Sequence, residues 1–150
     1  DIIISYADIV YQEGVLKKLM QDKNDFSVVV DKQWKELWEQ RMEDPLEDAE
    51  TLKIKNGNII EIGKEAQNYD DIEGQYIGLI KISKNAICQI VDYYEKLDRS
   101  QLYDSKNFNN MYMTSFVQII IDNLLNVKPV YINGGWVEVD SVSDLRVFCV

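Results

Sequence analysis

The stretch "FSVVVDKQWKELWEQR", Phe26 to Arg41, decides the fold. Its first part, Phe26 to Asp31, is an apolar run rich in valine, which favours a strand buried on both faces. Its second part, Lys32 to Arg41, has helical spacing, and one stripe of that helix carries Trp34, Leu37, Trp38 and Arg41. The stretch therefore predicts a buried strand followed directly by an amphipathic helix.

The residues before this stretch repeat the same order. Ile2 to Ile4 form a β-branched run that predicts another buried strand. Glu13 to Lys23 then predict a short amphipathic helix, whose apolar side carries Val15, Leu16, Leu19 and Met20. Strand, helix, strand and helix alternate over the first forty residues, which indicates an α/β fold with a parallel sheet.

The middle of the chain changes character. Thr51 to Lys64 contain two alternating segments around Asn56-Gly57, which is a strong signal for a β-hairpin. Gly74 to Ser83 predict another strand, with glycines where a bulge or a close approach of the backbone fits. Ser83 is placed to cap a helix that runs to about Asp98.

The last third predicts one buried helix and two strands. Met111 to Leu125 are apolar nearly all round, whereas "KPVYIN" and "GWVEVD" read as strands, and Ser141 to Leu145 read as the start of a helix. The chain shows no internal repeat and no interdomain linker, so residues 1–150 are predicted to form a single domain. The predicted class is α/β: a Rossmann-like, mixed, mostly parallel sheet flanked by helices, with a β-hairpin insertion.

Composition excludes several classes of function. Twenty-six acidic against 16 basic residues give a net charge of −10, which argues against nucleic acid and anionic membranes as partners. The chain has no run of the roughly 18–20 apolar residues that a membrane helix needs. It contains no histidine, which excludes a Ser-His-Asp triad and a histidine-based zinc site. Cys88 and Cys149 are isolated, so a disulfide framework is not predicted and the cytoplasm is the expected location.

Two acids follow predicted strands. Asp8 lies near the end of the first strand, and ligands of open α/β sheets bind in the crevice at the carboxyl ends of strands. A helix N-cap is an equally good interpretation of Asp8. Asp31 ends the second strand in the same way, with a weaker case. The stretch "MEDPLEDAE" (42–50) carries five acids and is predicted to be a solvated loop.

The stretch "GGWVEVD" (134–140) contains a second pair of acids. Residues two apart share one face of a strand, so Trp136, Glu138 and Asp140 point one way and the two valines between them point inward. Carboxylates together with substrate phosphates are the usual ligands of Mg²⁺. Ordinary surface charge on a half-exposed strand remains the alternative.

Six pieces of the chain follow one another in an informative order. They are "IIISYADIVY", "VVVD" followed by "WKELWEQR", "IIEIGK", "GQYIGLIKIS", "TSFVQIIIDNLL" and "WVEVDSVSDL". Together they resemble the nucleotidyltransferases, which join a nucleoside triphosphate to a small phosphorylated substrate. The resemblance spans nearly the whole chain. It is strongest to cytidylyltransferases acting on phosphocholine or phosphonates, and next to the sugar-1-phosphate type.

The resemblance implies roles for matched positions. Asp8, Glu138 and Asp140 match metal ligands, which implies Mg²⁺ as the cofactor and Asp8 and Asp140 as the catalytic pair. The substrate-binding positions that it implies are Tyr6, Lys64, Tyr76, Gly78 and Trp136. Lys64 falls where a lysine can meet a substrate phosphate. Ala7 stands where many sugar-type members have glycine, which weakens the sugar interpretation.

The implied reaction needs no histidine. An acceptor phosphate oxygen attacks the α-phosphorus of a nucleoside triphosphate, expected to be CTP, and pyrophosphate leaves. Trp34, Trp38 and Trp136 are candidates for an aromatic box around a quaternary ammonium, with core packing as the alternative. A sugar-1-phosphate nucleotidyltransferase and a non-catalytic binding or regulatory domain of the same fold remain alternatives. A homo-oligomer is compatible with the sequence.

One family feature has no match in these residues. Members begin with a Gly-rich loop, carrying Arg and followed by Lys, that cradles the nucleotide. Residues 1–150 match the later part of the family's domain, which holds the acceptor and the metal. The chain also starts with Asp1, inside a predicted strand. It is therefore expected to be an incomplete nucleotidyltransferase domain with little or no activity alone.

Overall fold

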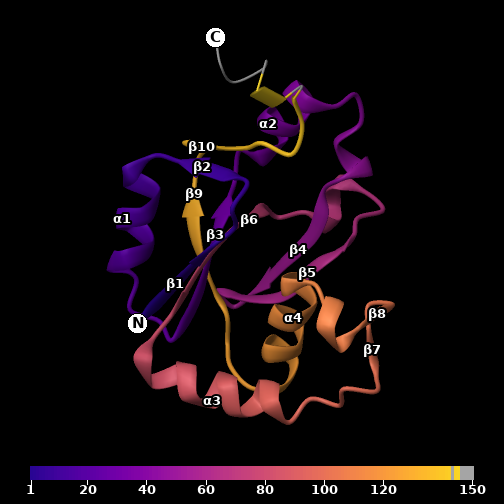
Figure 1. The fold of residues 1–150 in the computed structure, drawn as a ribbon. Helices are drawn as coiled ribbons and strands as arrows, with labels where there is room; N and C mark the ends of the chain where they lie inside the picture. Colours follow the sequence, from indigo (N-terminus) through magenta and orange to yellow (C-terminus); the bar gives the residue numbers. More distant parts are fainter. Residues whose placement is uncertain (143, 146–150) are drawn as a thin grey trace.

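The computed structural model describes residues 1–142 and 144–145, and its centre is a four-stranded sheet with the order β1-β6-β3-β9 (Figure 1). These strands span Ile2–Ser5 (β1), Gln75–Ile82 (β6), Phe26–Asp31 (β3) and Lys128–Ile132 (β9). β3 is buried along its whole length, as its apolar run predicts. The prediction of a buried strand at Ile2 to Ile4 is wrong, because β1 is an edge strand in which Ile2 and Ile3 are exposed. The mixed α/β class is confirmed.

The pairing within the sheet differs from the prediction of a mostly parallel sheet. β3 pairs with β9 in parallel, but β6 lies between β1 and β3 and runs antiparallel to both. The chain leaves β3 at Asp31 and re-enters the sheet at Gln75, directly opposite Asp31, so β6 must run back. β1, β3 and β9 still run in one direction, and their carboxyl ends meet at one edge.

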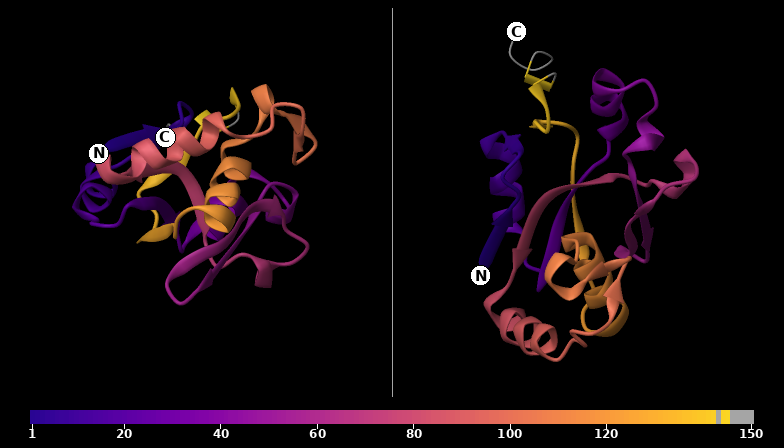
Figure 2. Two further views of the ribbon diagram at one scale, coloured as in Figure 1. Left: turned by 90° about the horizontal axis from the view of Figure 1, so that it is seen from below. Right: turned by 45° about the vertical axis from the view of Figure 1, so that its right-hand side comes forward.

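Helices and a hairpin cover the two faces of the sheet. α1 (Glu13–Gln21) and α2 (Trp34–Arg41) pack with Val29 of β3 in one core cluster. α3 (Lys84–Glu95), α4 (Met113–Asn123) and the hairpin pack with Val28 and Val30 in the other. Successive valines of β3 thus face opposite layers, as strand geometry requires. Figures 1 and 2 show α1 on one side of the sheet and α3 and α4 on the other.

The helices lie close to their predicted ranges, but in α1 and α4 the buried residues differ from the prediction. Ser83 caps α3, accepting a hydrogen bond of 3.2 Å from the Ala86 N–H, as predicted. On α1, Val15 and Leu19 are buried, but Met20 is 57% exposed and faces away from the core. α4 is buried on one face only, with Thr114, Ser115, Val117 and Ile120 inside.

The predicted hairpin is confirmed. β4 (Glu50–Lys55) and β5 (Asn58–Glu65) pair antiparallel around Asn56 and Gly57. Both turn residues have positive φ, 52° and 71°, which is the conformation that Asn-Gly favours in two-residue hairpins. Gln118 ties the hairpin to α4, because its side chain accepts from the Ile62 N–H at 2.9 Å and donates to the Ile60 carbonyl at 3.2 Å.

Smaller elements complete the fold. β2 (Ile9–Tyr11) pairs antiparallel with β10 (Trp136–Glu138), outside the central sheet. A short hairpin joins β7 (Leu102–Tyr103) and β8 (Lys106–Asn107), and 3₁₀ turns occupy Pro45–Glu47, Tyr69–Asp71 and Phe108–Asn110. Part of the helix predicted from Ser141, and Cys149, lie outside the described residues. Over the part that is described, no helix has the length and apolarity needed to cross a membrane.

Candidate metal and acceptor site

A bulge in β6 shapes the site. The register between β3 and β6 shifts where Val28 to Val30 face Ile80 to Tyr76, and Gly78 lies within this shift at φ +82°. The Tyr6 N–H donates to the Gly78 carbonyl at 2.9 Å. A Cβ on residue 78 would lie 2.6 Å from the Tyr6 ring, so only glycine lets Tyr6 approach this closely. A bulge, one of the two interpretations of the glycines in this strand, is therefore present.

A cavity of about 230 Å³ opens beside the bulge. Its lining residues come from six regions of the chain and are Tyr6, Trp38, Asp48, Glu50, Gln75, Tyr76, Ile77, Gly78, Tyr112, Met113, Thr114, Glu138 and Asp140. Three predicted substrate-binding residues, Tyr6, Tyr76 and Gly78, thus share one cavity with two predicted metal ligands. Neither lysine nor arginine lines it in the part of the chain that the structure describes.

Carboxylate oxygens of Asp8, Glu138 and Asp140 lie within 4.8 Å of one another. Pairing of β2 with β10 brings them together, and the Val139 N–H extends this pairing by donating to the Asp8 carbonyl at 2.9 Å. Asp8 is exposed and does not cap α1, whose N-cap is Gln12, so the capping interpretation is wrong. Three carboxylates at this spacing fit a hard cation such as Mg²⁺.

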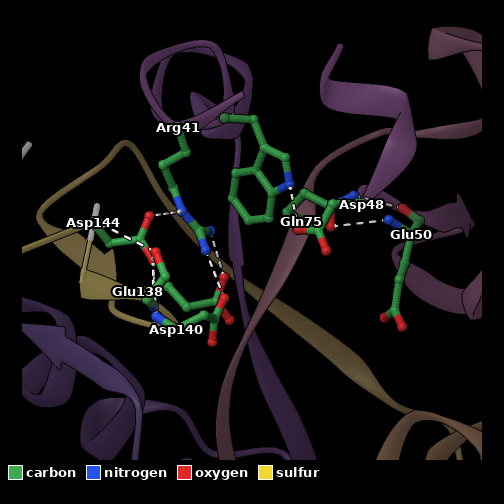
Figure 3. Close-up of polar contacts among 9 residues, drawn as sticks. Arg41, Asp48, Glu50, Gln75, Glu138, Asp140 and Asp144 are labelled. Carbon is green, nitrogen blue, oxygen red and sulfur yellow. Dashed lines mark hydrogen bonds and ion pairs between the residues drawn. The ribbon is translucent and has the colours of Figure 1, made fainter. Parts of the chain in front are cut away.

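Arg41 binds two of these acids from α2 (Figure 3). Its NH1 lies 2.7 Å from Glu138 Oε2, its NH2 lies 2.6 Å from Asp140 Oδ2, and its Nε lies 3.2 Å from Asp144 Oδ1. The Arg41 side chain is 4% exposed. Burial alone would lower the pKa of Arg41, but the three carboxylates raise this pKa by more than burial lowers it. The guanidinium is therefore charged. Burial raises the pKa of Glu138, and Arg41 only partly offsets this.

Asp31 is a buried hydrogen-bond centre. Its carboxylate accepts from the Trp136 indole at 2.8 Å and from the Gly134 and Gln33 N–H groups at 2.9 Å each. Trp136 is 5% exposed and packs in the core without lining the cavity of the site. Trp136 is therefore buried whereas Val137 is half-buried, which is the opposite of what strand alternation predicted for these two residues.

The three tryptophans considered for an aromatic box lie in the core, which agrees with the core-packing interpretation of Trp34 and Trp38. Trp34 and Trp38 are 5% and 4% exposed and contact each other edge to face. Only Trp38 reaches the cavity, and its indole donates to Asp48 Oδ2 at 3.0 Å. The aromatic surface of the cavity is instead formed mainly by Tyr6, Tyr76 and Tyr112.

The acidic stretch 42–50 contributes two residues to the cavity, Asp48 and Glu50. Gln75 holds the start of β4 in place, since its side chain bonds both the N–H and the carbonyl of Glu50 (Figure 3). Burial raises the pKa of Glu50 to about 7, helped by the charges of Asp48 and Glu138. The prediction of a solvated loop is correct for Glu43, Asp44 and Glu47, which are exposed. It is wrong for Glu50, which is half-buried.

Lys64 lies beside the cavity rather than in it. Its Nζ is 2.8 Å from Glu61 Oε2, and its side chain is 59% exposed. It lines a neighbouring cavity that also contacts Asp48, Glu50 and Tyr112. The geometry thus places Lys64 next to the site without a contact to the other predicted residues.

Arg41 and Glu50 belong to the candidate site but were not predicted from the sequence. Arg41 occupies the apolar stripe of α2, and a charged residue on a buried stripe requires buried partners of opposite charge. That signal was available in the sequence, although the identity of the partners was not. Glu50 gave no such signal, because a charge run next to a proline normally faces solvent.

Comparison with known proteins also relates the chain to nucleotidyltransferases. No protein-family model matches the chain. Over 147 residues the chain is 55% identical to a CTP:phosphoglutamine cytidylyltransferase of Campylobacter jejuni subsp. jejuni, covering 98% of this chain and 58% of that protein. The chain thus spans less than two thirds of the length of this curated relative.

Solved structures share the fold. An inositol-1-phosphate CTP transferase from T. maritima superposes with a TM-score of 0.67 at 19% identity, covering 95% of this chain and 50% of that one. A candidate glucose-1-phosphate thymidylyltransferase from Bacillus anthracis gives 0.65 at 13% identity, covering 96% and 51%. The predicted resemblance to nucleotidyltransferases is confirmed.

Proposed function

We propose that the protein carrying this chain transfers CMP from CTP to a small phosphorylated acceptor and releases pyrophosphate. The 55% identity to a CTP:phosphoglutamine cytidylyltransferase supports this proposal. The observation that carries it is the approach of Asp8, Glu138 and Asp140 to within 4.8 Å beside a cavity of acceptor size.

The three carboxylates would hold Mg²⁺, since their oxygen ligands suit that ion and leave positions for phosphate oxygens. Neutralising charge on the triphosphate is the chemistry that a metal ion supplies in such a site. The remaining work of the chain is positioning. An acceptor phosphate oxygen attacks the α-phosphorus of CTP, the bond to the β-phosphate oxygen breaks, and pyrophosphate leaves without a covalent intermediate.

The acceptor in this proposal carries a positively charged nitrogen. Asp48 and Glu50 face the cavity together with three tyrosines, and no described Lys or Arg lines it. A negative, aromatic cavity favours an ammonium group through charge and cation–π attraction. Phosphocholine, aminophosphonates and phosphoglutamine all combine such a nitrogen with a phosphoryl group. Lys64, beside this cavity, is proposed to contact the phosphate.

The test is pyrophosphate release by the protein carrying this chain, with CTP and a panel of acceptors: phosphocholine, 2-aminoethylphosphonate, phosphoglutamine and glucose 1-phosphate. We expect Mg²⁺-dependent turnover with a nitrogen-bearing acceptor, and a loss of about 100-fold or more in Asp8→Asn and Asp140→Asn. Glu43→Gln, an exposed acid outside the cavity, is the matched control.

Three outcomes would contradict parts of the proposal. Wild-type rates in both aspartate variants would remove the metal assignment. Turnover with glucose 1-phosphate alone would favour a sugar-1-phosphate enzyme. No turnover of CTP with any acceptor of the panel would favour a binding or regulatory domain.

A further inference from the structure

Arg41 bonds three separate carboxylates, one through each of its nitrogens. NH1 and NH2 reach Glu138 and Asp140, while Nε reaches Asp144. Glu138 and Asp140 belong to the acidic cluster with Asp8, whereas Asp144 does not. Each hydrogen bond uses one oxygen of its carboxylate, so the second oxygen of Glu138 and of Asp140 is not needed by Arg41.

The surroundings fix the guanidinium in place. The Oδ2 of Asp144, the oxygen that Arg41 does not use, accepts from the Asp140 and Ser141 N–H groups at 3.0 and 2.8 Å. The chain after β10 is thereby folded back onto Arg41. On the other side, the guanidinium carbon lies 5.7 Å from the centre of the Trp38 ring. A planar, fully anchored fork imposes one geometry on the acids that it binds.

Carboxylates this close repel one another unless a cation lies between or beside them. Arg41 supplies that cation from the protein itself and can hold Glu138 and Asp140 together before any metal arrives. Removing it would let the two side chains separate and take up other rotamers, so that binding a metal would also have to order them.

We infer that Arg41 is a positioning residue that presets Glu138 and Asp140 for metal binding. This inference rests on the proposed function, because it assumes that the acidic cluster holds a divalent cation. Arg41 acts through the two carboxylates and not on the reacting atoms. Its neighbour Asp144 serves to orient Arg41 and the loop that carries Asp140.

A role of Arg41 as a mere positive charge and a role in positioning the acids predict different metal affinities for the same substitutions. If Arg41 acted only as a positive charge near a cation, Arg41→Gln would bind a divalent metal more tightly, and Arg41→Lys would bind like wild type. If Arg41 positions the acids, both variants bind more weakly, since lysine keeps the charge but cannot form the three-way fork.

The experiment titrates the protein carrying this chain with Mn²⁺ and measures the free ion by electron paramagnetic resonance. We expect the Kd for Mn²⁺ to rise about tenfold, or about 1.4 kcal/mol, in both Arg41 variants. Arg99→Gln is the control, since Arg99 is 63% exposed and pairs only with Glu95 among the acids that the structure describes. Circular dichroism confirms that each variant is folded at the temperature of measurement.

Wild-type affinity in Arg41→Lys, or tighter binding in Arg41→Gln, would overturn the inference. If Arg41→Gln does not fold, Arg41→Lys decides alone, because it preserves the charge. Asp140→Asn separates this result from failure of the proposed function. Equal binding of Mn²⁺ by wild type and Asp140→Asn would show that the cluster holds no metal, whatever Arg41 does.

Discussion

Asp31 and Trp136 lie 105 residues apart in the chain and share a buried hydrogen bond of 2.8 Å. The bond joins the end of β3, in the central sheet, to the start of β10, which carries Glu138. Because the Gly134 N–H binds the same carboxylate, Asp31 fixes both the turn before β10 and its first residue. Asp31 was predicted as a weak ligand candidate, and its observed contacts are structural.

We expect Asp31→Asn to lower the free energy of unfolding by about 2–3 kcal/mol, because an amide replaces a charged acceptor of three N–H groups. The amide nitrogen of the asparagine would direct its own N–H at an N–H group that Asp31 now accepts from. Urea denaturation measures the loss. Asp92→Asn, an exposed position on α3, is the control for removing the charge alone. Equal stability of the two variants would contradict a structural role for Asp31.

Gly78→Ala is expected to damage the site more than a comparable substitution in a turn. Gly78 combines φ +82° with a Cβ position 2.6 Å from Tyr6, whereas Gly57 has φ +71° and open space around it. Gly57→Ala should therefore cost about 1–2 kcal/mol from backbone strain alone. Gly78→Ala adds the clash and should displace Tyr6 from the cavity. Urea denaturation measures the free energy of unfolding of both variants. A similar loss in each would refute the importance of the close approach between Gly78 and Tyr6.

Glu50 predicts a specific pH dependence. Its pKa is about 7 in the folded chain against an ordinary 4.5, so the folded state keeps a proton that the unfolded state loses between these values. The stability from this proton is full below about pH 4.5 and is lost as the pH rises through 7. Glu50→Gln should therefore flatten the fall in unfolding free energy over that range.

The matched control for Glu50→Gln is Glu43→Gln, which removes the same charge from an exposed position. Chemical denaturation at a series of pH values compares the two. An identical pH dependence in wild type and Glu50→Gln would contradict the raised pKa. With a cationic acceptor, binding should also strengthen as the pH rises through 7, because Glu50 becomes charged.

Local signals in the sequence predicted most elements of the fold. Asn56-Gly57 specified its turn because few residue pairs accept positive φ at both positions. Ser83 specified the start of α3 through its side chain. The direction of β6 was not predictable in this way, since a strand buried on both faces has the same pattern in either direction.

The candidate site was predicted only in part for a related reason. Alternation in the stretch 134–140 predicted that Glu138 and Asp140 share one face, and both contact Arg41 and line the cavity. Which face of that strand is buried depended on Asp31, a partner more than 100 residues away. Contacts over such separations leave no periodic trace in the sequence.

The long separations around Arg41 also bear on the order in which the protein forms. Arg41 finds its partners 97, 99 and 103 residues later, so these three ion pairs cannot all form during synthesis until Asp144 has been made. Contacts of this range slow folding, because distant segments must meet before they stabilise anything. A nascent chain ending before Gly134 would hold Arg41 without these three acids and Asp31 without two of its three donors. The metal-binding edge can therefore consolidate only after the chain as far as Asp144 has been made.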